Sequence, residues 1–195
     1  MPTKNPIYAA IDKQHQQMSE LFLMHQEALM IEKVDLAADI YHSYQALQLA
    51  HLAFENNCLL PELAKLESPR WPHTLYQHEH NKIEALLEKH AQNIENSQTF
   101  LDKPNTTAQA YRRWIIELFD QHKTLKNVLE HHEQREEQGL LPELSNALSE
   151  AQIEAACQQL QEFTQASLDR IFDRSQAWIM ALNVNQNSPD ASALA

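Results

Sequence analysis

One short segment occurs twice in the sequence, and each copy contains residue types that bind metal ions. The first copy, HLAFENNCLLPEL, begins at His51, and the second, HEQREEQGLLPEL, begins at His132. Both combine H-x-x-x-E with the continuation L-L-P-E-L. Residues four apart lie on one face of a helix, about 6 Å from each other. His51 with Glu55, and His132 with Glu136, are therefore spaced to offer a nitrogen and an oxygen to one cation.

The H-x-x-x-E spacing can also arise by chance, as a pair of side chains on the surface of a helix. The chain has 11 histidines, and His80 with Glu84 also satisfies H-x-x-x-E. Two features favour metal binding by the other pairs: the shared continuation, and the position of His51 and His132 on apolar helix faces, where unpartnered polar groups are costly. His15 and His80 also lie in the middle of apolar faces. Spacing alone leaves open whether those two bind metal or pack in the core.

Long stretches without proline or glycine must position these side chains. The single glycine, Gly139, favours helices over tight hairpins. Apolar residues three or four apart predict five helices, over residues 7–29, 34–63, 73–94, about 107–136 and 149–183. Pro61 is expected to bend or end the second helix. Asn105 or Thr106 is expected to cap the fourth.

The predicted fold class is all-α, an up-down four-helix bundle with an additional C-terminal helix. Residues 1–148 are expected to form the metal-binding bundle, and residues 149–183 an additional packing helix of the same domain. Residues 184–195 are polar and rich in small residues, which predicts a mobile tail. An exposed Trp178 on the additional helix is expected to contribute to a surface for a homodimer or another partner.

Composition restricts the compartment and the partners. A formal net charge of −12 disfavours nucleic acid and anionic membranes as partners. No apolar run has the length of a signal peptide or a membrane span. Cys58 and Cys157 lack the spacing of a zinc motif or a disulfide framework, which predicts a reducing compartment and therefore the cytoplasm. No nucleophile elbow or nucleotide-binding loop is present, so conventional hydrolase or kinase activity is not expected.

The residues described so far resemble the hemerythrin and HHE cation-binding family, a four-helix bundle with the ligand order His, H-x-x-x-E, His, H-x-x-x-E. The resemblance covers roughly residues 7–148 and includes I-D-K-Q-H, ending at His15, and E-H-N-K-I-E-A-L-L, around His80. It implies a hemerythrin-like fold and these metal ligands: His15, His51, Glu55, His80, His132 and Glu136. The family pattern does not select the other histidines, which are His25, His42, His73, His78, His90, His122 and His131.

The sequence also departs from the family pattern. Oxygen-carrying hemerythrins have a further histidine four residues before the position of His80, where this chain has Tyr76. Tyr76 could ligate iron, hydrogen-bond to an iron-bound oxygen or simply pack, and the last two are favoured. The family commonly has a second glutamate directly after the glutamate of H-x-x-x-E. This chain has Glu137 after Glu136, but Asn56 stands at the equivalent position after Glu55.

Ligating histidines usually donate their second N–H to a nearby acceptor. Asp12, Glu79 and Glu133 are close enough in sequence to the candidate histidine ligands to accept these hydrogen bonds. Acidic residues of this kind are more commonly part of the solvated surface.

Four imidazoles and two carboxylates suit iron, manganese or zinc, and the resemblance favours two iron ions. If Glu55, Glu136 and an oxo or hydroxo group bridge the irons, about two of twelve coordination positions stay open for a small molecule. The leading hypothesis is a non-haem di-iron protein that binds, senses or reacts with oxygen, nitric oxide or peroxide. One alternative is a di-iron protein that repairs damaged iron–sulfur clusters or donates iron. Another is a non-catalytic helical interaction module.

Overall fold

The computed structural model describes residues 5–101 and 107–183, and all regular structure in these ranges is helical. The all-α prediction is confirmed. The predicted mobile tail, residues 184–195, lies outside the described residues. The elements are α1 (Pro6–Met30), α2 (Val34–Phe54), the π-helix η1 (Glu55–Leu59), α3 (Leu60–Leu63), α4 (His73–Leu101), α5 (Ala108–Arg135), the π-helix η2 (Glu136–Leu140), α6 (Leu141–Ala147) and α7 (Glu150–Asn183).

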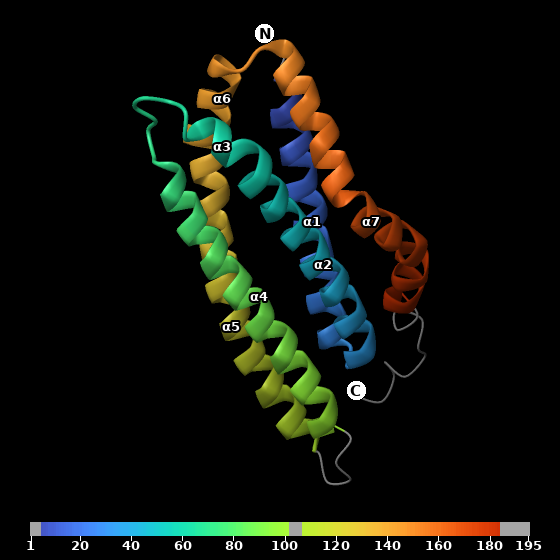
Figure 1. Ribbon diagram of the computed structural model, residues 1–195. Helices are drawn as coiled ribbons and strands as arrows, with labels where there is room; N and C mark the ends of the chain where they lie inside the picture. The colour runs from blue at the N-terminus through green and yellow to red at the C-terminus, as the bar shows by residue number, and fades with distance from the viewer. Residues whose placement is uncertain (1–4, 102–106, 184–195) are drawn as a thin grey trace, which may run out of the picture.

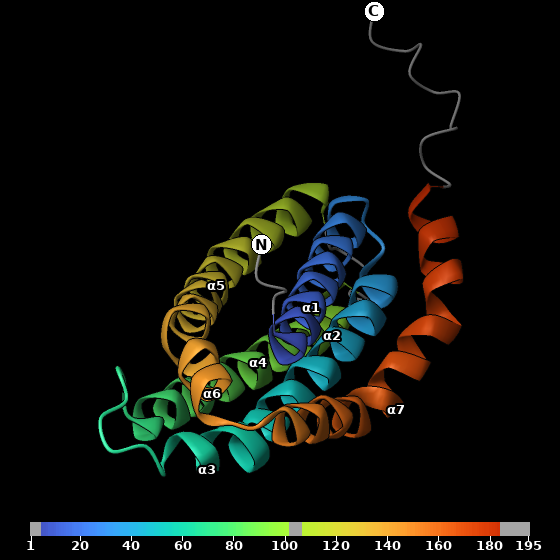
Figure 2. The same ribbon diagram turned by 90° about the horizontal axis from the view of Figure 1, so that it is seen from above.

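The long helices α1, α2, α4 and α5 lie alongside one another (Figure 1), and the core contains side chains from them and from α7. Helix α1 packs on α2, α2 on α4, and α4 on α5. Hydrogen bonds also join α5 to α1, because the Tyr111 hydroxyl donates to the Leu29 carbonyl at 2.7 Å. Helix α7 packs on α1 and α2 from outside the four long helices (Figure 2). The short helices α3 and α6 contact each other at one end.

The ends of the helices follow local capping chemistry. The Asn5 side chain accepts a hydrogen bond from the Ile7 amide at 3.2 Å and begins α1. Thr107 caps α5 by accepting from the Ala110 amide at 3.2 Å. The prediction of Asn105 or Thr106 as this cap was wrong, and those two residues lie outside the described ranges. Helix α4 begins directly after Pro72, as predicted, but continues beyond residue 94 to Leu101.

A layer of polar side chains divides the core into two apolar clusters. One cluster includes Phe22, Tyr44 and Ile83, and the other includes Phe54 and Leu140. Burial of these apolar side chains is the main source of stability of such a bundle. Among the described residues, no helix is both long and apolar enough to cross a lipid bilayer.

The outer face of α7 differs from the sequence prediction. Trp178 is only 2% exposed, and its indole N–H donates to the Asp39 carboxylate on α2 at 2.8 Å. The prediction of an exposed Trp178 was therefore wrong, because the indole lies on the face of α7 that packs on the bundle. The large apolar side chains that this helix exposes are Phe163, Phe172, Ile179 and Met180.

Candidate metal centre

Six buried side chains from the polar layer meet between the helices. His15 comes from α1, His51 from α2, Glu55 from the start of η1, His80 from α4, His132 from α5 and Glu136 from the start of η2. They form two triads, and within each triad one ligand atom from every residue lies within 4.8 Å of the others. The structure thus brings together all six residues that the sequence singled out.

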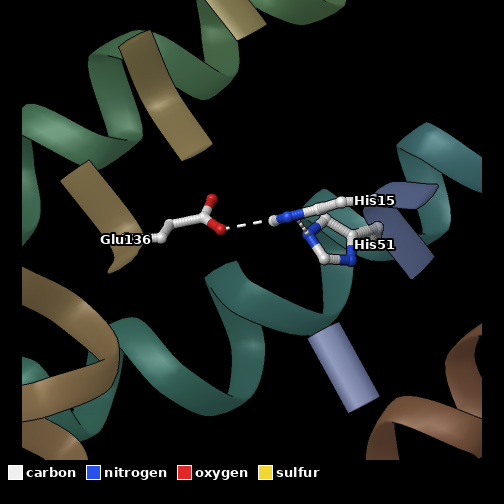
Figure 3. Close-up of side chains that lie close together, drawn as sticks. All are labelled: His15, His51 and Glu136. Atoms are coloured by element: carbon white, nitrogen blue, oxygen red, sulfur yellow. Dashed lines mark hydrogen bonds and ion pairs between the residues drawn. The ribbon is translucent and has the colours of Figure 1, made fainter. Parts of the chain in front are cut away.

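The first triad joins His15, His51 and Glu136 (Figure 3). The Nε2 atoms of His15 and His51 are 3.2 Å apart. The Glu136 Oε2 atom lies 3.4 Å from His15 Nε2. The carboxylate and the two imidazoles therefore face one another across the interior from separate helices.

The second triad joins Glu55, His80 and His132. The Glu55 Oε2 atom lies 3.1 Å from His80 Nε2 and 3.6 Å from His132 Nε2. The rings of His80 and His132 are 4.8 Å apart between centroids. This triad has the same composition as the first, two imidazoles and one carboxylate.

Each carboxylate also contacts the other triad. Glu55 Oε1 lies 3.1 Å from His51 Nε2, so its two oxygens face histidines of different triads. Glu136 does the same, with Oε1 2.6 Å from His132 Nε2 and Oε2 near His15. Each carboxylate therefore lies between the two triads, with one oxygen toward each of them.

Three of the four imidazoles are oriented by hydrogen bonds from Nδ1. His51 Nδ1 lies 2.9 Å from Gln14 Oε1, and His80 Nδ1 lies 2.8 Å from Asn56 Oδ1. These amide oxygens can only accept, so each ring carries its proton on Nδ1 and presents an Nε2 lone pair to the centre. This is how a metal-binding histidine is usually held.

His132 is held by a carboxylate. Its Nδ1 atom lies 3.2 Å from Glu79 Oε2, and the other Glu79 oxygen accepts from Arg135 at 2.7 Å. Glu79 was one of the partners considered from sequence, whereas Gln14 and Asn56 were missed.

Glu133 was also considered from sequence as a hydrogen-bond partner of a ligating histidine. Burial and the nearby Glu136 raise the pKa of Glu133 to about 7.

The donor atoms of the centre fit cations. Both oxygens of Glu55 and of Glu136, and Nε2 of His80 and His132, are buried without a hydrogen-bond partner. A neutral imidazole with its proton on Nδ1 faces these oxygens lone pair to lone pair, which is repulsive unless a proton or a cation lies between them. Burial would raise the pKa of Glu55, but His51, His132 and His80 outweigh it and hold that pKa well below its usual range.

The opposite shift occurs at His132. Burial would lower its pKa, but Glu136 and Glu55 raise the pKa well above its usual value. The centre therefore attracts positive charge to the space between its imidazoles and carboxylates, and a metal ion would displace protons from it.

Both glutamates begin a π-helical turn. The Leu60 amide donates to the Glu55 carbonyl, and the Leu141 amide donates to the Glu136 carbonyl, each five residues back along the chain. The sequence predicted that Pro61 bends or ends its helix. The helix widens just before Pro61 and ends at Leu63, two residues after the proline. Such turns are often found at functional sites.

Tyr76 does not direct its hydroxyl to the triads. The hydroxyl donates to the Arg135 carbonyl at 3.1 Å and accepts from the Leu140 amide at 3.2 Å, so it links the two ends of η2. Burial raises the pKa of Tyr76, which keeps the hydroxyl protonated. Among the three roles considered from sequence, this geometry fits packing with hydrogen bonding to the backbone.

The single glycine lies against Tyr76. A Cβ atom on Gly139 would lie 2.6 Å from Trp71 Cε3 and 3.0 Å from the Tyr76 hydroxyl. Real Cβ atoms almost never approach so closely, so η2 packs against these two rings only because position 139 lacks a side chain.

A model of the family described as the hemerythrin HHE cation binding domain matches residues 7–144. This match covers more than half of the 195 residues, and the chain belongs to this family. The resemblance inferred from sequence is therefore confirmed. Comparisons with curated proteins and with solved structures gave no match.

Proposed function

We propose that the chain holds two metal ions, iron by preference, in a centre that binds, senses or reacts with oxygen, nitric oxide or peroxide. The supporting observation is that Glu55 and Glu136 each direct one oxygen toward each triad. His15 and His51 would hold one ion, and His80 and His132 the other. Manganese and zinc also suit this donor set.

Bound iron would supply redox chemistry and coordination positions for a small molecule. The protein positions the imidazoles through Gln14, Asn56 and Glu79, and the two apolar clusters exclude bulk water from both sides of the polar layer. Because the Tyr76 hydroxyl donates and accepts within η2, it does not take the place of a fifth histidine ligand, so the metal would have fewer protein ligands than in an oxygen carrier.

The experiment compares metal content in matched variants. Wild-type protein supplied with Fe(II) in air should bind two irons per chain and develop charge-transfer bands in the visible spectrum. His51→Ala combined with His132→Ala should lose the iron and the colour. The control combines His78→Ala with His131→Ala and should behave as wild type. These two histidines are exposed and lie close in sequence to His80 and His132. Circular dichroism shows whether each variant keeps its helices.

Two results would contradict the proposal. A colourless wild-type protein that binds no iron would show that the six residues do not form an iron centre. Unchanged iron in the His51 and His132 variant would show that other residues are the ligands.

We also propose that α1, α2, α4 and α5 form an up-down four-helix bundle within residues 1–148. Residues 149–183 would belong to the same domain. Exposed Phe172 and Met180 on α7 support a homodimer through that helix. Cys58 and Cys157 are both free thiols, which fits a reducing compartment such as the cytoplasm.

A further inference from the structure

A small pocket lies between α1, α2 and α5. Its volume is about 250 Å³, and its lining residues come from these three helices. One water molecule takes up about 30 Å³ in the liquid, and pockets for drug-sized ligands have about 300–1,000 Å³. The pocket therefore suits a molecule of a few atoms rather than an organic cofactor.

Three lining residues place the pocket close to the candidate metal centre. Met18, Gln48 and Leu129 line it, and each is three residues from a candidate ligand on its own helix. These ligands are His15, His51 and His132. Three residues correspond to about 4.5 Å along a helix, which is less than one turn.

The three lining residues also lie on the same side of the centre. Helices α2 and α5 run antiparallel to α1, because residues along α1 contact them at decreasing residue numbers. Met18 follows its ligand in the sequence, whereas Gln48 and Leu129 precede theirs. The centre and the pocket are therefore adjacent levels of the same bundle.

The pocket reaches the surface between α1 and α5. These two helices pack less closely on each other than α1 on α2, α2 on α4, or α4 on α5. Ser19 on α1 and Glu130 on α5 line the pocket and are exposed. A small molecule from solvent can therefore enter at this seam and approach the centre.

A buried hydroxyl without a partner belongs to the lining. Tyr44 on α2 lines the pocket, is 2% exposed, and forms no hydrogen bond through its hydroxyl. Burial, and secondly the charge of Glu133, raise the pKa of Tyr44, so the hydroxyl stays protonated and lies near that carboxyl group. Glu133 lines the pocket from α5. Because a buried polar group without a partner is costly, the hydroxyl favours a molecule that forms hydrogen bonds.

The other polar groups of the lining narrow the class of molecule. Gln48 is 3% exposed and adds an amide. Two carboxyl groups, of Glu130 and Glu133, face one ammonium, of Lys126, which disfavours an anion. Oxygen and nitric oxide are poor hydrogen-bonding molecules and would leave the Tyr44 hydroxyl unpartnered. Hydrogen peroxide is neutral and consists of two linked hydroxyl groups, each of which donates and accepts.

We propose that this pocket binds hydrogen peroxide between the Tyr44 hydroxyl, the Gln48 amide and the Glu133 carboxyl group, beside the metal ions with which it reacts. This role rests on the proposed metal function and selects one of its three small molecules. The Tyr44 hydroxyl donates to a peroxide oxygen. A carboxyl oxygen of Glu133 accepts from a peroxide O–H, which it can do in either protonation state.

The structural test uses protein loaded with Zn(II), which has no redox chemistry. Crystals soaked in hydrogen peroxide should show two bonded oxygen atoms in the pocket, within hydrogen-bond distance of the Tyr44 hydroxyl. The same soak of Tyr44→Phe should show none. Separate water molecules only in the wild-type pocket, or peroxide that is retained in Tyr44→Phe, would overturn the proposal.

A kinetic test uses the Fe(II)-loaded protein. Tyr44→Phe and Gln48→Leu should each slow the reaction with peroxide about 2–10-fold, the effect of one lost hydrogen bond, in stopped-flow absorbance. The rate with oxygen and the iron content should stay at the wild-type values. Gln134→Leu is the matched control, since Gln134 is exposed and lies next to Glu133 in the sequence. An unchanged peroxide rate in both pocket variants, or an equal loss of the oxygen rate, would refute the peroxide site.

The peroxide site and the metal function fail in different ways. If the protein bound no metal while metal-free crystals soaked in peroxide showed the two bonded oxygens, only the proposed function would fail. If iron bound and reacted with peroxide at the wild-type rate in both pocket variants, only the peroxide site would fail.

Discussion

Replacing Tyr76 by phenylalanine tests whether this hydroxyl supports the backbone or binds metal. The change removes one oxygen that donates to the Arg135 carbonyl and accepts from the Leu140 amide. Leu140 is fully buried, so water cannot replace the lost acceptor. We therefore expect a destabilised η2 turn and an unchanged number of metal ions per chain.

The size of the effect follows from the buried amide. A buried donor without an acceptor costs about 1–3 kcal/mol. For a chain of this length, each kcal/mol lowers Tm by about 2–4 °C, so Tyr76→Phe should lower Tm by about 2–12 °C. The matched control is Tyr44→Phe, because the Tyr44 hydroxyl is buried and has no hydrogen-bond partner to lose. That variant should be as stable as wild type or more stable.

The assay combines thermal unfolding with metal analysis at saturating iron. Loss of one ion per chain in Tyr76→Phe would show that the phenol is a ligand. A Tm equal to that of wild type would show that the hydroxyl does not hold η2 in place. Either result refutes the role argued from the hydrogen bonds.

Three further changes test other parts of the structure. Gly139→Ala places a Cβ 2.6 Å from Trp71, so denaturant unfolding should show a loss of about 1–3 kcal/mol, and wild-type stability would refute the close contact. Gln14→Leu removes the acceptor for His51 Nδ1, so chelator competition should show about 10–100-fold weaker metal binding. His25, with a pKa of about 4, stays neutral in the fold while the unfolded chain takes up a proton below pH 6.5. His25 should therefore contribute a fall in stability of about 1.4 kcal/mol per pH unit from pH 6.5 to 4, and His25→Leu should have a shallower slope than wild type.

The helices and four residues of the centre could be predicted because their signals are local. His15 and His80 were left open by their spacing and were selected by the family resemblance. Apolar spacing of three or four residues marked the buried face of each helix, and the repeated segment placed His51, Glu55, His132 and Glu136 in equivalent positions. The histidine or glutamate on such a face is conspicuous because it interrupts an apolar pattern. Packing of the helices then brings these interruptions to one level.

The partners of the centre could not be predicted in the same way. Gln14 and Asn56 are ordinary polar residues in sequence, and their role depends on which helix faces them. The two π-helical turns have no local propensity signal that separates them from α-helix. Trp178 was misplaced because an amphipathic pattern shows that a helix has an apolar face without showing which neighbour covers it.

Three buried histidines outside the candidate metal centre also had a signal in the sequence. His25, His90 and His122 are each ten residues from a candidate ligand, forward on two helices and backward on the third. This alternation is expected when neighbouring helices run in opposite directions. A search for equal spacings between histidines on different predicted helices would have found it.

The hydrogen bond between Gln14 and Thr164 connects α7 to the candidate metal centre. Gln14 Nε2 donates to the Thr164 hydroxyl at 2.9 Å, and the same amide positions His51. Thr164 lies beyond residue 144, where the family match ends. A contact that supports the candidate metal centre therefore lies outside the segment that the family model matches. A protein truncated at the end of the match would retain every candidate ligand but lose part of the support that orients His51.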